Sequence, residues 1–95
     1  MTFQRARGDD WWFHARGVPG AHVIVRAQGK SLFPDTIRRA AELAAYYSRS
    51  RGEANVAVDY TRRRQVRRIR GAAPGLVSYA GEQTVRVTPR GPDED

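Results

Sequence analysis

Hydrophobic and polar residues alternate along much of the chain, which is the period of β-strands that bury one face. The segment WWFHARGVPGAHVIV, residues 11–25, alternates on both sides of a Pro-Gly turn whose glycine is free to adopt positive φ. Trp11 and Phe13 fall on one face of the first strand, and Trp12 and His14 fall on the other. This pattern predicts a hairpin with Trp11 and Phe13 in the core and with Trp12 or His14 at least partly accessible.

A helical period is found at residues 33–52, FPDTIRRAAELAAYYSRSRG. Its apolar stripe is mostly alanine, which lets a helix lie close on a sheet. We predict Asp35 as the N-cap residue and Gly52 as the residue that ends the helix after Arg49. Charged residues, Glu42 among them, are expected on the outer face.

Short alternating segments after the helix predict the remaining strands. Residues 55–61, NVAVDYT, form one of them, and the arginine-rich residues 62–70 follow. Residues 76–80 and 84–89 flank a Gly-Glu-Gln turn, as in a terminal hairpin. The predicted fold is therefore α+β, with one helix packed on a mostly antiparallel or mixed sheet and the element order β-β-α-β-β-β-β.

The length of 95 residues suits one domain with one hydrophobic core. We expect residues 1–90 to form that domain and residues 91–95, GPDED, to be an acidic mobile tail. No apolar run approaches the ~18 residues that a membrane span requires, and the first residues do not resemble a secretory signal. The expected compartment is the cytoplasm, with no membrane partner.

Charge changes this picture more than any other bulk property. Seventeen Lys and Arg residues stand against ten Asp and Glu, which gives a net charge of +7, and sixteen of the bases are arginine. The planar guanidinium pairs bidentately with phosphate and stacks on bases, so a basic domain of this kind most often binds nucleic acid. The chain has no cysteine, which excludes a disulfide framework, a thiolate zinc site and a cysteine nucleophile.

Candidate catalytic side chains gather on one face of the predicted hairpin, where Asp10, Trp12 and His14 are joined by His22 across the turn. A carboxylate can orient a histidine that acts as a general base. However, no serine stands in a nucleophile-elbow context, and two histidines eight residues apart without cysteine are weak zinc ligands. We expect no cofactor, no metal and no enzymatic activity. The alternative is a small hydrolase or metal-dependent enzyme that uses His14 and His22.

Six arginines occupy nine positions from Arg62 to Arg70. In an extended strand, Arg62, Arg64, Arg68 and Arg70 would share one face. Such a run suits the phosphate backbone of RNA. The alternative interpretation is a solvated edge strand that its charge protects against aggregation.

Several separated motifs resemble the NFACT-R family. DDWWFHARGVPGAHVIV at residues 9–25 is similar to the family signature, and VAVDYTRRRQVRRIRGAAPGLVSY at residues 56–79 is similar to its second conserved block. The likeness runs in order over residues 2–89. It implies an RNA-binding module of ribosome-associated quality-control factors such as bacterial RqcH, and this module is not known as an enzyme. The implied partners are tRNA or large-subunit rRNA, and with them the ribosome.

The resemblance also implies that the histidine hairpin is a functional surface. Together with the arginine run, it gives a predicted nucleic-acid-binding set of Asp10, Trp12, His14, His22, Arg62, Arg64, Arg67, Arg68 and Arg70. The chain departs from the family at Ala21, where serine is usual, and it begins inside the family's leading segment. If that segment normally pairs with the sheet, an unpaired edge would favour a homodimer or a partner chain that supplies it.

Overall fold

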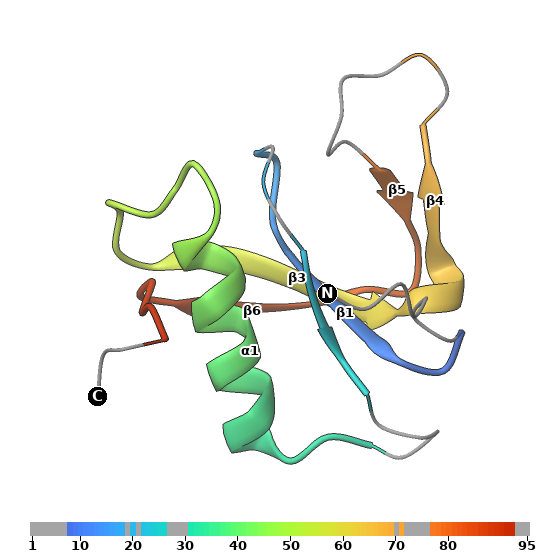
Figure 1. Ribbon diagram of the computed structural model, residues 1–95, viewed down its shortest axis with the longest axis horizontal. Helices are drawn as coiled ribbons and strands as arrows, with labels where there is room; N and C mark the ends of the chain where they lie inside the picture. Colours follow the sequence, from blue (N-terminus) through green and yellow to red (C-terminus); the bar gives the residue numbers. More distant parts are fainter. Residues whose placement is uncertain are drawn as a thin grey trace.

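The computed structural model describes residues 8–18, 20, 22–26, 31–69, 71 and 77–92, with Arg68 described by its backbone alone. The elements are β1 (Trp11–Ala15), β2 (Val23–Val25), α1 (Pro34–Tyr46), β3 (Val56–Arg62), the 3₁₀ helix η1 (Arg63–Gln65), β4 (Val66–Arg68), β5 (Val77–Tyr79) and β6 (Gln83–Val87). The α+β class and the predicted order β-β-α-β-β-β-β are confirmed (Figure 1). Predicted features at Pro19, Ala21, Arg70 and residues 93–95 lie outside the described residues.

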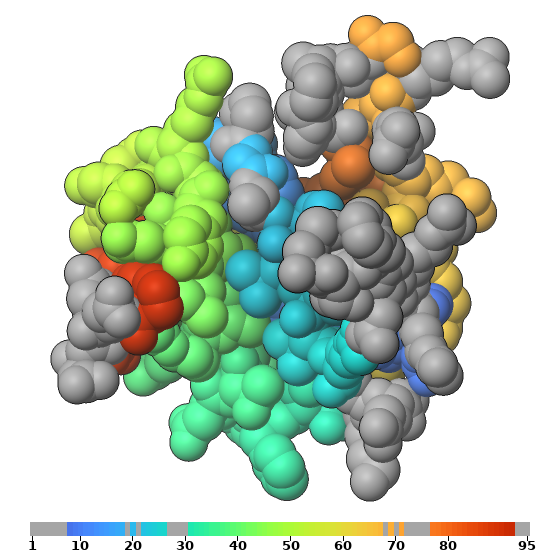
Figure 2. Space-filling view, viewed as in Figure 1, coloured from blue at the N-terminus to red at the C-terminus, as the bar shows by residue number. Residues whose placement is uncertain are grey.

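The main sheet has four strands in the order β2-β1-β3-β6, and each pair is antiparallel. Its register places His14 opposite Asp59, and Val58 opposite Val85. Helix α1 lies against one face of this sheet, while β4 and β5 form a separate two-stranded sheet (Figure 1). Figure 2 shows α1 and β2 side by side on the viewed face, where a shallow groove runs between them.

The predicted terminal hairpin is wrong. β5 pairs with β4, whereas β6 pairs with β3 in the main sheet. Gly81, at φ 67°, lies in the turn that separates β5 from β6. Val85 and Val87 of β6 then pack against the core, which favours the main sheet over a local hairpin.

Both faces of β1 are covered, so the prediction that Trp12 or His14 is partly accessible is also wrong. Phe13 is fully buried on the α1 side, as predicted. On the other side Trp12 is 1% exposed and His14 is 6% exposed. Trp11, predicted to be core, is only half-buried. The alternation of hydrophobic and polar residues along a strand distinguishes its two faces. It does not show whether a second layer of the fold covers the more polar face.

Helix α1 begins differently from the prediction. Phe33 is the N-cap residue and makes no side-chain cap, and Pro34 opens the helix. Proline suits this position because its φ is already helical and its missing N–H would have no partner in the first turn. Asp35 lies in the first turn instead, where its carboxylate interacts favourably with the helix dipole.

The same helix ends at Tyr46, several residues before the predicted Gly52. The Ser48 hydroxyl donates to the Ala45 carbonyl at 2.7 Å and accepts from the Ser50 amide at 3.1 Å. These local bonds satisfy backbone groups that would otherwise continue the helix. Within the described residues, no helix combines the length and the apolar character needed to cross a bilayer.

Glu42 is buried instead of lying on a solvated outer face. Its carboxylate lies 3.3 Å from Arg39 and 3.6 Å from Arg90, which follows β6. Arg39 also donates to the carbonyl of Gly91 at 2.8 Å. This cluster fastens the end of the described chain to α1.

Gly20 is required for close approach. It forms an isolated bridge with Ser48, and a Cβ at this position would lie 3.0 Å from the Ser48 Cα. Although glycine is free to adopt positive φ in a Pro-Gly turn, Gly20 does not, and Gly17 takes the left-handed conformation instead, at φ 72°. Gly20 is thus held against the residues that follow α1.

Candidate nucleic-acid interface

The sheet face opposite α1, called the distal face below, carries the residues that alternate with the core. Val56, Val58 and Tyr60 of β3 pack in the α1-side cluster, so the residues between them point the other way. The same alternation holds on β1 and β6. The distal face therefore carries Trp12, His14, Arg16, Ala57, Asp59, Thr61, Thr84 and Arg86.

Four aromatic rings meet on the distal face. Trp12 stacks on His14 with ring centroids 5.4 Å apart, and Tyr79 of β5 lies 4.8 Å from Trp12. His22 lies 6.3 Å from Trp12, and extending the β1–β2 register by one residue places it opposite His14. The predicted gathering of Trp12, His14 and His22 is thus observed. Tyr79 of the β4–β5 hairpin covers Trp12, and this contact was not predicted.

His14 is fixed by a bond to its own strand. Its Nδ1 lies 2.7 Å from the Ala15 carbonyl, which can only accept, so Nδ1 carries the proton and donates. In the neutral ring Nε2 is then an acceptor, and it is buried with no hydrogen-bond partner among the described residues. The hydroxyls of the buried Ser48 and Ser50 lie elsewhere, at the end of α1. The imidazole is therefore oriented by backbone, and its Nε2 makes no hydrogen bond to a described hydroxyl.

Asp59 is the most buried charge on the distal face, at 1% exposed. Its carboxylate accepts from the Tyr79 hydroxyl at 2.5 Å and from the Thr84 hydroxyl at 2.6 Å. The Arg16 guanidinium lies 3.4 Å from the same carboxylate. Burial raises the pKa of Tyr79 well above its usual range, and the bond to Asp59 adds to the effect. Tyr79 therefore stays a donor and ties the hairpin to the main sheet.

The arginine run is bent, which corrects the expectation of one extended face. β3 ends at Arg62, the 3₁₀ turn η1 follows, and β4 begins at Val66. Arg62 donates to the Asp9 carbonyl at 2.6 Å and lies over the Trp11 ring at 4.0 Å. Arg63 donates to the Val66 carbonyl at 3.2 Å. These two guanidinium groups are engaged with the fold.

The predicted binding set separates into three groups by exposure. Asp10, Trp12 and His14 are buried, and Arg62 is half-buried. The exposed members are His22, Arg64 and Arg67. The side chain of Arg68 and all of Arg70 lie outside the described residues.

Asp59, Tyr79 and Arg16 were absent from the predicted binding set. Asp59 and Tyr79 both fall within the second conserved block, at residues 56–79, and neither was predicted to bind RNA. A buried acid on an alternating strand is a recognisable signal, because a buried carboxylate needs donors. Its donors come from β5, β6 and the end of β1, so the sequence could not name them. Among the described residues, no three His, Asp or Glu side chains gather as a metal site requires.

The pH dependence of stability should report on His22. Partial desolvation of the His22 ring, followed by the nearby charges of His14 and Arg63, lowers its pKa from 6.5. Below that ordinary value the unfolded chain gains a proton more readily than the folded chain, so stability is full above it and falls as pH drops through it toward the lowered value. Urea unfolding above and below pH ~6.5 should show a smaller loss in His22→Asn than in wild type. An equal loss in both proteins would place the titrating group elsewhere.

Comparison with known proteins adds to this geometry. The family model for the NFACT protein RNA binding domain, NFACT-R, matches residues 2–81. The Rqc2 homolog RqcH of Bacillus subtilis (strain 168) is 43% identical over 91 residues, which is 94% of this chain and 15% of that protein. RqcH of Streptococcus pneumoniae (strain D39 / NCTC 7466) is 42% identical, again over 94% of this chain, and 16% of its length is covered. The chain thus spans a small part of these relatives.

A solved structure shares the fold. The C-terminal part of the fibronectin/fibrinogen-binding protein from Streptococcus suis superposes with a TM-score of 0.80 at 38% sequence identity. The match covers 93% of this chain and 35% of that one.

Proposed function

The chain belongs to the NFACT-R family of RNA-binding domains, and from this premise we propose that it binds the phosphate backbone of structured RNA and performs no chemistry on it. The observation that carries the proposal is the division of the arginine run. Arg62 and Arg63 hold the fold together, which leaves Arg64 of η1 and Arg67 of β4 exposed. We propose tRNA or large-subunit rRNA as the RNA partner. We also propose that this binding serves ribosome-associated quality control.

Backbone contact is favoured over base reading by the burial of the aromatic rings. Trp12 is covered by Tyr79 and stacked on His14, so it offers no free face to a base. Arginine forks match phosphate geometry and hold an RNA in place without reading its sequence. We therefore expect affinities that differ little between RNA sequences of the same shape.

The buried members of the predicted set support the interface from beneath. Trp12 packs under Tyr79, and the Asp10 carbonyl accepts from the Arg63 amide at 2.8 Å. These contacts fix the path of the chain from β3 into η1 and β4. His22, Arg64 and Arg67 then form the accessible part of the proposed interface.

The salt dependence of RNA binding tests this proposal. Each single-stranded phosphate neutralised changes the slope of log affinity against log salt by ~0.7, so Arg64→Gln with Arg67→Gln should flatten it by about 1.4. Melting temperature should change little, because both side chains are exposed. The matched control is Arg38→Gln with Arg49→Gln, which removes the same charge from exposed positions on and just after α1. Labelled tRNA transcript titrated between about 50 and 200 mM salt gives the slopes.

Two results would contradict the proposal. Equal slopes in the test and control variants would mean that Arg64 and Arg67 are only a solvated surface. Turnover of the RNA that His14→Ala abolishes would favour the hydrolase alternative.

A further inference from the structure

The distal face continues past the aromatic rings to a part that the β4–β5 hairpin does not occupy in the described contacts. Beyond the row of His14, Asp59 and Thr84, the next row holds the residue that follows β1 and one residue each from β3 and β6. The Arg16 amide donates to the Ala57 carbonyl at 2.9 Å, and Ala57 pairs with Arg86. Arg16, Ala57 and Arg86 therefore lie side by side across the sheet.

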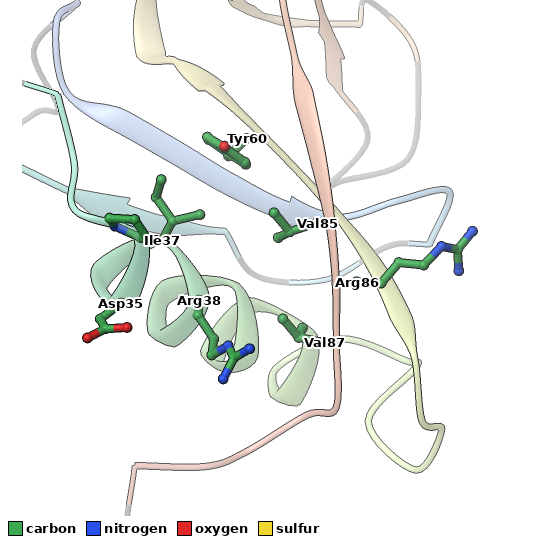
Figure 3. Close-up of a pocket in the computed structure, with 8 residues that line it drawn as sticks. Asp35, Ile37, Arg38, Tyr60, Val85, Arg86 and Val87 are labelled. Atoms are coloured by element: carbon green, nitrogen blue, oxygen red, sulfur yellow. The ribbon is translucent and has the colours of Figure 1, made fainter.

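Arg86 points to this face and away from the core. An open pocket on the α1 side of β6 is lined by Ile37, Tyr60, Val85 and Val87 (Figure 3). In that view Val85 and Val87 point toward α1, and the Arg86 guanidinium extends away from the pocket. The alternation of β6 gives the same result, because the neighbouring distal residue Thr84 reaches Asp59.

The row of Arg16, Ala57 and Arg86, called the trough below, has a small side chain between two long ones. Adjacent strands are about 4.8 Å apart, so the Cα atoms of Arg16 and Arg86 are separated by roughly 10 Å. The methyl group of Ala57 lies between them, and that residue is half-buried. Two long cationic side chains thus flank a low floor.

One wall of the trough is held in place from below. The Arg16 Nε lies 3.4 Å from the Asp59 carboxylate, which the Tyr79 and Thr84 hydroxyls already hold. The Arg16 side chain is nevertheless 56% exposed, and a guanidinium has five N–H donors. Most of its donors therefore face outward, and holding the side chain lowers the entropy lost when it binds a ligand.

The other wall is held more loosely. The Arg86 Nη1 lies 3.3 Å from the Asn55 carbonyl, and the side chain is exposed. Its remaining donors are free to meet an anion. Arg16 and Arg86 together outweigh the buried Asp59, so the trough carries a net positive charge.

We propose that Arg16 and Arg86 form a second phosphate-binding site, at which each contacts one phosphate of the RNA strand that the arginine run holds. This inference rests on the proposed function and extends the interface across the distal face. Two residues of strand span about 6.6 Å, so the trough lies one such step from His14 and two from Trp12. Trp12 and His14 are buried, whereas His22, opposite His14 in the extended register, is exposed.

The test compares Arg16→Gln/Arg86→Gln with the Arg38→Gln/Arg49→Gln control. The probe is an RNA hairpin with single-stranded flanks, and the readout is the slope of log affinity against log salt. Loss of two single-stranded phosphate contacts should flatten the slope by about 1.4, while the control stays close to wild type. Arg16→Lys/Arg86→Lys should keep most of the slope but bind more weakly, because lysine keeps the charge and lacks the fork.

Each outcome decides between alternatives. Wild-type binding with the same slope in the test and control variants would overturn the second site and leave the proposed function standing. A wild-type chain that binds no RNA would overturn both. Retained RNA binding, with loss of a labelled poly-glutamate peptide in Arg16→Gln/Arg86→Gln, would assign the trough to an acidic protein. Thermal melting must first show that the Gln variants are folded. If they are not, the RNA affinity of Arg16→Lys/Arg86→Lys decides: weaker binding than wild type supports the second site, and unchanged binding overturns it.

Discussion

Trp12→Ala is expected to bring the domain close to unfolding at room temperature. A fully buried tryptophan costs ~3–5 kcal/mol when truncated to alanine, and domains of this size have a total stability of only ~5–15 kcal/mol. Trp12 is 1% exposed and contacts the rings of His14, His22 and Tyr79. Its loss leaves a cavity between the main sheet and the β4–β5 hairpin. Urea unfolding followed by circular dichroism measures the change.

Trp11→Ala is the matched control for this prediction. Trp11 is half-buried and packs against Tyr60 at 5.9 Å and under the Arg62 guanidinium. The surrounding solvent can fill part of the space it leaves, so a smaller loss of stability is expected. A larger loss for Trp11 than for Trp12 would contradict the burial described for β1.

Asp59→Ala should have the second largest effect on stability. A hydrogen bond to a charged group contributes about 1.5–3 kcal/mol, and the bonds from Tyr79 and Thr84 would both be lost. Burying one charge fewer offsets part of this, so we expect a net loss of about 2–4 kcal/mol. Asp35→Ala, which removes an exposed acid from the first turn of α1, should cost less than 1 kcal/mol or so.

A double-mutant cycle with Tyr79→Phe separates the network from simple burial. If the Tyr79 hydroxyl acts through Asp59, the two substitutions should be non-additive by about 0.5–3 kcal/mol. Additive losses would mean that the carboxylate and the phenol stabilise the fold independently. Denaturant midpoints of the four proteins are sufficient for this comparison.

The order of elements could be predicted because the hydrophobic pattern of each segment reflects how that segment is buried. The strands around Phe13 and Val58 and the alanine stripe of α1 show this pattern in their own residues. The pairing of β5 and the end of α1 could not be predicted in this way. They depend on where Tyr79 finds Asp59 and on local bonds of Ser48, which the period of hydrophobic residues does not contain.

The candidate site, like the fold, could be predicted only in part. Composition showed that arginine dominates, and the motifs brought Trp12, His14 and His22 together. Which arginines are free is decided by distant backbone carbonyls, such as that of Asp9 for Arg62. Arg16 was overlooked because its partner Asp59 lies far along the chain. Charge along a sequence indicates a binding protein, whereas the binding side chains emerge only from the fold.

The β4–β5 hairpin forms a separate two-stranded sheet, whereas the other strands pair with one another in the main sheet. Beyond the contacts of Tyr79, it is joined to the main sheet by the Thr61 hydroxyl, which donates to the Ala80 carbonyl at 2.9 Å. An isolated two-stranded hairpin is marginally stable in water, so this one should open locally at a lower free energy than the sheet beneath it. A ligand that binds only the closed hairpin lowers the population of the open form. If the proposed RNA contact at Arg67 forms only on the closed hairpin, RNA binding would itself increase the order of the hairpin.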